Sequence, residues 1–187
     1  MLIVGFGDVG VRAARLLTPR VRVLALVREA ARAGTLRAQG VTPLLGDLDD
    51  AASLRRLAGI ATRVIHLAPP PAEGEGDPRS AALLRALARR TAPLALVYAS
   101  TSGVYGDCGG AHGRFAGAAR VSRRSRRRRV AAESALRAFG RAAGTRTSIL
   151  RIPGIYAPDR EGGTPRARLL KGPLCWWPRT TCTPNPS

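Results

Sequence analysis

The chain has 187 residues and a formal net charge of +19, with 45% hydrophobic and 23% charged residues. The length suits one α/β domain, or one domain plus an incomplete second, and the composition is typical of a globular protein and argues against wholesale disorder. No apolar run approaches the roughly 20 residues that a membrane-spanning helix needs. Met1 leads straight into the apolar residues 2–4 without a basic leader, so we expect no secretory signal. Three cysteines are too few for a disulfide framework, and we expect a cytoplasmic protein.

Strands and helices are predicted to alternate along the first 161 residues. In chain order the predicted elements are strand 2–5, helix 8–18, strand 21–27, helix 29–39, strand 41–45, helix 49–58, strand 63–68, helix 78–90, strand 94–99, helix 130–143 and strand 147–152. In the first helix, Val9, Ala13, Leu16 and Leu17 are expected to share the buried face. The alternation predicts an α/β fold of Rossmann type, a doubly wound parallel sheet within one domain over residues 1–161.

The strongest motif is Gly5-Phe6-Gly7-Asp8-Val9-Gly10, which follows the first predicted strand and begins the first predicted helix. This context is typical of the G-x-G-x-x-G dinucleotide fingerprint. Gly5 permits the tight turn, Gly7 lets a pyrophosphate approach the backbone, and Gly10 lets the helix pack on the strand. The free N–H groups and the positive end of the helix would hold the phosphates. A glycine-rich turn without a ligand is the alternative.

The residue that ends the second predicted strand selects between the two nicotinamide dinucleotides. An acid at this place binds the ribose 2′-OH of NAD. This chain has Arg28, with Glu29 beside it. An arginine suits the 2′-phosphate of NADP, and Arg32 follows one helical turn later. We therefore favour NADP as cofactor. NAD is the alternative, in which Glu29 would bind the ribose.

Four motifs, taken in this order and spacing, resemble the extended and atypical branch of the short-chain dehydrogenase/reductase superfamily, the NAD-dependent epimerase/dehydratase-like proteins. The motifs are Gly5–Gly10, Gly46-Asp47-Leu48, the stretch Ala99–Gly106 after the fifth strand, and the stretch Arg151–Pro158 after the sixth. The resemblance covers residues 1–110 and 130–161. It implies an enzyme that transfers hydride with a nicotinamide cofactor.

The resemblance also implies residues that contact the cofactor. Asp47 would accept a hydrogen bond from the adenine amino group, and Leu48 would pack on the adenine ring. The alternative for Asp47 is a cap on the helix that follows it. Further contacts would come from a loop after the fourth strand and a segment after the sixth: Leu67, Ala68, Pro69 and Pro153. His66 is interpreted as a strand residue and not as a catalyst.

Catalysis in active members of the superfamily uses a Ser or Thr after the fifth strand and a Tyr-x-x-x-Lys pair on the next helix. Thr101 would orient the reacting carbonyl or hydroxyl. The lysine lowers the pKa of the tyrosine, so that the phenol can transfer a proton near neutral pH. Counted back from Glu133, Ser125 stands in place of the tyrosine and Arg129 in place of the lysine. The acid–base pair is therefore missing.

Two segments depart from the family pattern. Residues 111–129 contain eight arginines and no acid, and residues 162–187 lose all helix and strand patterning. When the codons of the tail are read one base earlier, Cys175-Trp176-Trp177-Pro178 gives Leu-Val-Ala, which resembles the sequence before the second lobe of the family. We therefore expect an out-of-frame tail that removes the C-terminal substrate lobe, and a compensated shift of the same kind in residues 111–129.

Other interpretations exist for these two segments. A basic arm over 111–129 could bind nucleic acid, but Phe115 is its single aromatic residue for stacking on bases. Cys175 and Cys182 could bind a metal, but they lack C-x-x-C spacing and a histidine partner. We therefore expect no metal site, no nucleic-acid partner and no membrane partner.

The sequence predicts an NAD(P)-binding oxidoreductase or epimerase-like protein that transfers hydride to or from a sugar nucleotide or a small carbonyl compound. The cofactor would carry the chemistry, and the protein would supply orientation and electrostatics. The alternative is a catalytically inactive dinucleotide-binding module or truncated remnant, which the missing acid–base pair favours.

Overall fold

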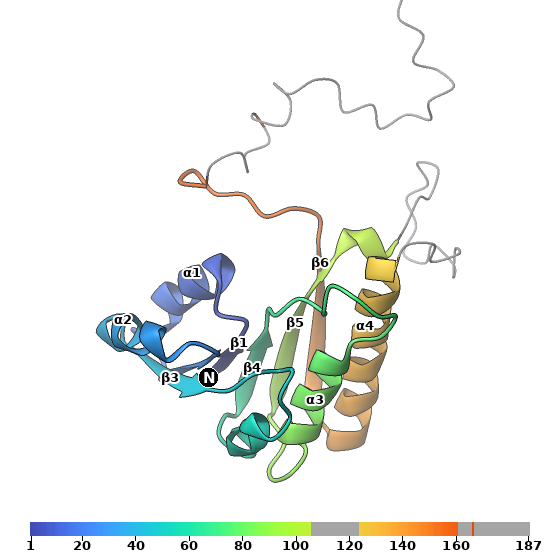
Figure 1. Cartoon of the computed structure of the whole chain (residues 1–187), viewed down its shortest axis with the longest axis horizontal. Coiled ribbons are helices and arrows are strands. Elements are labelled where there is room, and N and C mark those ends of the chain that lie inside the picture. Colours follow the sequence, from blue (N-terminus) through green and yellow to red (C-terminus); the bar gives the residue numbers. More distant parts are fainter. Residues whose placement is uncertain (106–123, 161–165, 167–187) are drawn as a thin grey trace, which may run out of the picture.

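Six parallel strands form one sheet in the order β3-β2-β1-β4-β5-β6 (Figure 1). The strands are β1 (Leu2–Val4), β2 (Val23–Val27), β3 (Val41–Leu45), β4 (Arg63–His66), β5 (Ala95–Thr101) and β6 (Arg146–Ile152). The computed structural model describes residues 1–105, 124–160 and 166. The order reverses between β1 and β4, which is the switch point at which doubly wound sheets bind ligands beside the carboxyl ends of their strands.

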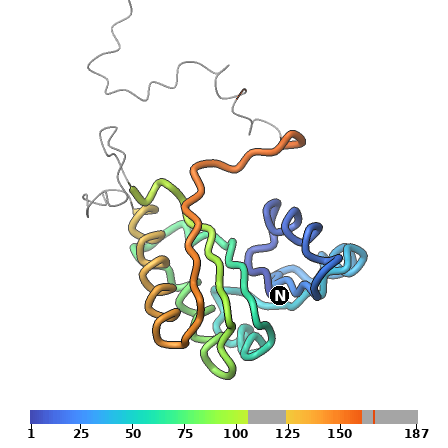
Figure 2. The backbone as a smooth tube through the Cα atoms, turned by 180° about the vertical axis from the view of Figure 1, so that it is seen from behind, coloured from blue at the N-terminus to red at the C-terminus, as the bar shows by residue number. Residues whose placement is uncertain are grey.

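Helices cover the sheet on both faces (Figures 1 and 2). They are α1 (Asp8–Leu17), α2 (Ala33–Ala38), α3 (Pro78–Leu87) and α4 (Arg124–Ala143), with the short 3₁₀ helices η1 (Ala30–Arg32), η2 (Ser53–Leu57) and η3 (Ser102–Val104). Strand β1 has no exposed face, because Leu2 and Val4 pack in the core under α3, α4 and η2, while Ile3 packs in the core under α1 and α2. The predicted doubly wound α/β fold is confirmed.

Two expectations about helices need correction. Of the four residues predicted on the buried face of α1, Ala13 and Leu17 are partly buried against the core and Val9 is half-buried, but Leu16 is 75% exposed; the fully buried residues of the helix are Gly10 and Ala14. The predicted helix 49–58 is a series of turns that ends in η2. Ser53 donates to the Asp50 carbonyl at 2.7 Å and accepts from the Asp47 amide at 2.9 Å, so side-chain bonds replace the bonds of a regular helix.

Helix α4 begins at Arg124, six residues before the predicted start, so residues 124–129 of the arginine-rich segment are helical. The rest of that segment lies outside the described residues. So do the three cysteines and, apart from Arg166, the tail 162–187. Among the helices that the structure describes, none has the length and apolar character needed to span a membrane.

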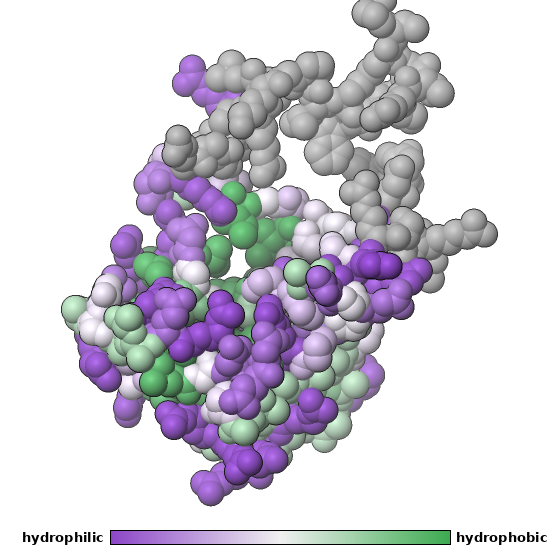
Figure 3. Space-filling model, in the orientation of Figure 1, coloured by the Kyte–Doolittle hydropathy of each residue, from purple (hydrophilic) through white to green (hydrophobic). Residues whose placement is uncertain are grey.

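The two edges of the sheet differ. Edge strand β3 contains Pro43, which has no N–H group to donate. The opposite edge strand, β6, has seven residues and no proline. Beyond β6, Ile155 and Tyr156 are exposed large apolar residues. Apolar surface is visible in Figure 3 in the hollow at the upper end of the sheet in this view, where the strands end.

Candidate functional site

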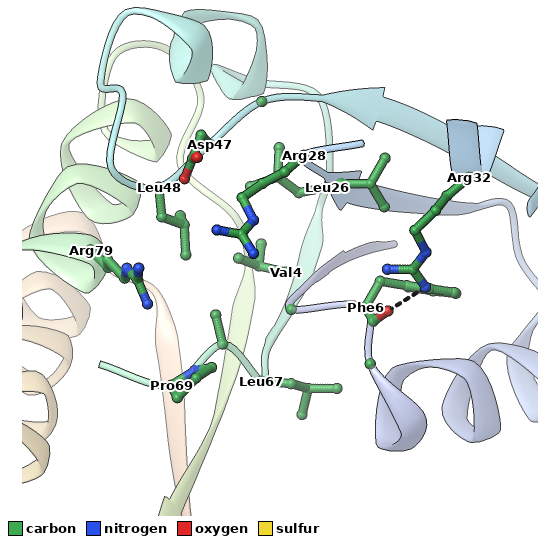
Figure 4. Close-up of a pocket in the computed structure, with 15 residues that line it drawn as sticks. Val4, Phe6, Leu26, Arg28, Arg32, Asp47, Leu48, Leu67, Pro69 and Arg79 are labelled. Carbon is green, nitrogen blue, oxygen red and sulfur yellow. Dashed lines mark hydrogen bonds between the residues drawn. The ribbon is translucent and has the colours of Figure 1, made fainter. Parts of the chain in front are cut away.

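A cavity of about 390 Å³ lies at the carboxyl ends of the strands near the switch point. This volume lies in the usual range for ligand sites. Nine predicted cofactor residues line the cavity: Gly5, Phe6, Gly7, Arg28, Asp47, Leu48, Leu67, Ala68 and Pro69. They follow four different strands and are brought together by the parallel order of the sheet (Figure 4). Val4, Leu26, Val27, Arg32, Gly46 and Arg79 complete the lining.

The glycine-rich loop has the geometry expected of a backbone that a ligand approaches closely. Gly5 has a positive φ of 88°, and a Cβ atom there would lie 2.3 Å from the nitrogen of Ala68. A Cβ on Gly10 would lie 3.1 Å from the carbonyl oxygen of Gly5, because α1 packs tightly on the loop. By contrast, a Cβ on Gly7 would meet nothing within 4 Å. Gly7 therefore leaves open space beside the first turn of α1.

The start of α1 offers unsatisfied main-chain donors. The N-cap is Gly7, which supplies no side-chain bond, and the first bond to the cap is from the Val11 N–H to the Gly7 carbonyl at 2.9 Å. The N–H groups of Asp8, Val9 and Gly10 precede it and have no acceptor within the helix. With the positive end of the helix dipole, they form a site for an anion.

The carboxylate of Asp8 in this first turn is neutralised by neighbouring arginines. Arg12 donates to Asp8 at 2.8 Å and makes two further bonds of 2.9 Å to Asp159, which follows β6. Arg160 lies 3.6 Å from Asp8. These bonds tie the segment after β6 to α1, and Arg12 lowers the pKa of Asp159. The negative charge of the first turn is therefore largely compensated.

Arg28 follows β2 directly, and its guanidinium points into the cavity (Figure 4). Among the described residues, no hydrogen bond or ion pair holds it. Arg32 also lines the cavity, but it donates to the Phe6 carbonyl at 2.9 Å and so braces the glycine-rich loop. Glu29 is exposed and does not line the cavity. Arg28 is therefore the charged group at the end of β2 that is free to meet a ligand.

Asp47 and Leu48 follow β3 and lie on the side of the cavity away from Arg32 and Phe6 (Figure 4). Asp47 accepts from the Asp49 N–H at 3.0 Å, so it caps the turn that follows as well as lining the cavity. Beside them lies Arg79, the second residue of α3, which was not predicted as a site residue. Arg79 makes two bonds to the carboxylate of Asp49, thirty positions earlier in the chain. Nothing in the sequence indicates that Asp49 is the partner of Arg79, so this contact could not be predicted.

Thr101 and Pro153 do not line the cavity. Thr101 ends β5 and accepts from the Gly103 N–H at 3.2 Å, which leaves its own hydroxyl hydrogen free to be donated. Pro153 is exposed and directly follows β6. Their roles in the site stay predictions.

A buried carboxylate joins the strands behind Thr101 to helix α4. Glu133 is 1% exposed and accepts from Ser100 at 2.7 Å and from Arg151 at 3.1 and 2.7 Å. Arg137 adds a bond of 2.9 Å. Burial by itself raises the pKa of Glu133, but the bonds from these donors outweigh it and leave the pKa lowered. Ser100 is thus occupied, whereas its neighbour Thr101 keeps a donor.

Arg129, at the position of the family lysine, is directed into the protein. It donates to the Tyr98 hydroxyl at 3.0 Å and to the Ala99 carbonyl at 2.9 Å. Ser125, at the position of the family tyrosine, is exposed on the first turn of α4. Tyr105 lies against Arg151, whose guanidinium carbon is 4.7 Å from the ring centre. No tyrosine is among the described residues that line the cavity.

His66 is a buried strand residue, as predicted. Its Nε2 lies 2.8 Å from the hydroxyl of Ser80, which donates to Asp77 at 2.6 Å. Since the Ser80 hydrogen points to Asp77, the His66 ring must carry its proton on Nε2. Burial, and then the charge of Arg129, lower the pKa of His66 to about 3, so the ring is neutral. No cluster of three or more His, Cys, Asp or Glu side chains suited to a metal occurs in the described parts of the chain.

Comparisons with solved structures show that other proteins share this fold. A candidate epimerase from Burkholderia cenocepacia matches with a TM-score of 0.71 and 23% identity, over 90% of this chain and 58% of its own. UDP-glucuronic acid 4-epimerase from Bacillus cereus, in complex with NAD, matches with a TM-score of 0.68 and 19% identity, over 87% and 59%. An NADPH-dependent quinone oxidoreductase from Escherichia coli, complexed with NADPH, matches with a TM-score of 0.57 and 21% identity, over 80% and 47%.

The chain thus spans about half to three fifths of the length of these relatives. A comparison with curated proteins found no match. The model of the NAD dependent epimerase/dehydratase family matches residues 1–171, which include the glycine-rich loop, the cavity and all six strands. The chain therefore belongs to the NAD dependent epimerase/dehydratase family.

Proposed function

We propose that the chain binds NADP(H) in the cavity at the switch point and presents its nicotinamide for hydride transfer. The observation that carries the proposal is the convergence of Gly5–Gly7, Arg28, Asp47 and Leu48 on one cavity of about 390 Å³. The open space beside Gly7 and the uncapped start of α1 fit a pyrophosphate. When bound, the nicotinamide cofactor supplies a hydride donor or acceptor.

NADP is favoured over NAD by the charge at the end of β2. Arg28 offers an unpaired guanidinium inside the cavity, which suits the 2′-phosphate of NADP through two parallel hydrogen bonds. The nearest acid in the sequence, Glu29, does not line the cavity and so is not available to the ribose of NAD. The structural relatives include one solved with NAD and one with NADPH, so the preference rests on Arg28.

The substrate would be a sugar nucleotide or a small carbonyl compound, held at the nicotinamide end. Thr101 would donate its free hydroxyl hydrogen to the reacting oxygen, since its acceptor side already holds Gly103. Pro153 would lie against the nicotinamide. The chain would work in the cytoplasm, without a metal.

A second candidate function is a dinucleotide-binding module without catalysis. Arg129 stands where the family has its lysine, and its guanidinium is already bonded to Tyr98 and Ala99. Its Nη1 is therefore held against Tyr98 and Ala99 and is not available to a phenol or to the ribose. This observation favours a chain that retains the cofactor site while lacking proton transfer.

Direct titration of the full chain with NADPH and NADH, followed by cofactor fluorescence, tests the proposal. We expect NADPH to bind at least tenfold more tightly than NADH. The variant Arg28→Ser should abolish this difference by weakening NADPH alone, and Arg37→Ser, which removes an exposed arginine outside the cavity, should not. Absence of binding by both cofactors would overturn the proposal. Oxidation of NADPH with a panel of carbonyl compounds then separates the enzyme from the inactive module.

A further inference from the structure

Two arginines that line the cavity, Arg28 and Arg79, differ in their hydrogen bonding. Arg79 donates from Nε and Nη2 to the two carboxylate oxygens of Asp49, at 2.8 and 2.5 Å. Its side chain is 24% exposed and that of Asp49 is 48% exposed. The bonds from Arg79 lower the pKa of Asp49, so the carboxylate stays ionised and the pair as a whole is neutral. No described acid makes a hydrogen bond with Arg28, whose charge contributes only at longer range to the lowered pKa of Asp49.

This difference assigns different ligands to the two side chains. An unpaired guanidinium in a cavity attracts a phosphate group. A guanidinium whose Nε and Nη2 already donate to a carboxylate has fewer donors left for a phosphate, but its flat face is still able to stack on an aromatic ring. The bidentate pair with Asp49 also fixes the orientation of that face, because both bonds lie in the guanidinium plane.

The place of Arg79 agrees with contact to a base. In Figure 4, Arg79 lies on the same side of the cavity as Asp47 and Leu48, while Arg32 lies on the far side near Phe6. Asp49 is adjacent to Leu48 in the chain, so the bonds of Arg79 tie the start of α3 to the loop that carries Leu48. Arg79 and Leu48 therefore offer an arginine plane and an apolar side chain on one side of the cavity.

We infer that Arg79, held by Asp49, is an adenine-binding residue whose guanidinium packs against the base of the bound dinucleotide, whereas Arg28 binds its 2′-phosphate. The inference rests on the proposed function and adds the residue that recognises the base. Arg79 contacts the ligand, and Asp49 is a positioning residue that acts through Arg79.

Fragments of the cofactor separate the two roles. We would titrate the full chain with three fragments. The compound 5′-AMP has adenine without a 2′-phosphate, 2′,5′-ADP has both groups, and nicotinamide mononucleotide has neither adenine nor a 2′-phosphate. Arg79→Ala should weaken 5′-AMP and 2′,5′-ADP by the same factor, about tenfold, and leave nicotinamide mononucleotide unchanged. Arg28→Ser should weaken 2′,5′-ADP alone.

Two further variants test whether the flat guanidinium of Arg79 packs on the base and whether Asp49 fixes its orientation. Arg79→Lys keeps the charge but not the flat fork, so it should lose nearly as much affinity for 5′-AMP as Arg79→Ala. Asp49→Asn should lose less than Arg79→Ala, because the guanidinium remains but is no longer fixed. Arg85→Ala, on the exposed side of the same helix, should bind all fragments as the parent chain does.

Different outcomes would overturn the inference and the proposed function. A loss in Arg79→Ala that is confined to 2′,5′-ADP would make Arg79 a phosphate-binding residue and overturn the inference. Equal affinity of Arg79→Ala and the parent chain for 5′-AMP would overturn it as well, while leaving the proposed function intact. If the parent chain binds none of the adenine fragments and no dinucleotide, the proposed function itself fails. Because the ion pair is partly solvent-exposed, we expect all variants to melt within a few degrees of the parent chain.

Discussion

The backbone of Gly5 lies directly against the backbone of Ala68, so close that a Cβ atom on Gly5 would be 2.3 Å from the Ala68 nitrogen. This contact joins the turn after β1 to the turn after β4, and both residues line the cavity. Gly5 also has a positive φ, which L side chains rarely adopt. The stability of the fold and the shape of the site therefore depend on the same glycine.

Gly5→Ala should destabilise the whole chain. The clash with Ala68 and the strained φ together cost roughly 3 kcal/mol or more, which lowers the melting temperature by about 10 °C. Thermal unfolding followed by circular dichroism measures this. The matched control is Gly7→Ala, whose Cβ enters open space beside α1. We expect Gly7→Ala to melt like the parent chain but to bind NADPH at least tenfold more weakly. Equal melting temperatures for both variants and the parent chain would contradict this account of Gly5.

Glu133→Gln should cost roughly 3 kcal/mol of unfolding free energy. The substitution leaves Arg151 beside a neutral amide in a buried network, which is the situation in which one partner of an ion pair is lost. Denaturant unfolding measures the loss. Arg137→Ala removes the exposed partner of the same carboxylate and should cost less than about 1 kcal/mol. If Glu133→Gln and Arg137→Ala lose the same unfolding free energy, the ion pair between Glu133 and Arg151 is not what stabilises the network.

The stability of the chain should fall as the pH decreases below 6.5, and His66 should be a cause. Its pKa is lowered to about 3 by burial and by Arg129, from an ordinary value of 6.5. The unfolded chain therefore binds a proton that the folded chain rejects, and this contribution to stability is complete above pH 6.5 and decreases as the pH falls toward 3. The slope from one such group is at most about 1.4 kcal/mol per pH unit.

Unfolding at pH values between 6.5 and 5 isolates this effect, because the carboxylates of the chain titrate mainly at lower pH. His66→Gln keeps a donor for Ser80 without a titrating ring and should flatten the slope. His112→Gln, which changes the other histidine of the chain, is the control and should leave the slope unchanged. Parallel slopes for the parent chain and His66→Gln would show that another group is responsible.

Thr101→Val should lower kcat for NADPH oxidation by about 10- to 100-fold without changing NADPH affinity, if the chain reduces a carbonyl compound. The reason is that the variant loses the hydroxyl that orients the reacting oxygen. Thr101→Ser keeps the hydroxyl and the bond from Gly103, so it should retain most of the activity. Steady-state kinetics with a responsive carbonyl substrate check this. A fully active Thr101→Val would remove Thr101 from the reaction.

Much of the fold and of the lining of the cavity could be predicted from the sequence, because local patterns determine them. Apolar runs indicate where the strands lie. Gly5 and Gly10 stand where a Cβ atom would be crowded by backbone atoms, and Gly7 stands where the space beside the loop is open. The failures have physical causes. The predicted helix 49–58 gave way to turns because Ser53 bonds to nearby backbone groups. Arg79 was missed because its role depends on Asp49, a contact that only the folded chain creates.

Pro43 gives the sheet one edge that resists further pairing. A polypeptide laid along β3 would meet a main chain interrupted by a residue with no N–H group. Along β6 it would meet seven residues without a proline. In the described part of the chain no strand pairs with the outer side of β6. A strand added to this sheet, from another polypeptide or from a second copy of the chain, would therefore pair more readily with β6 than with β3.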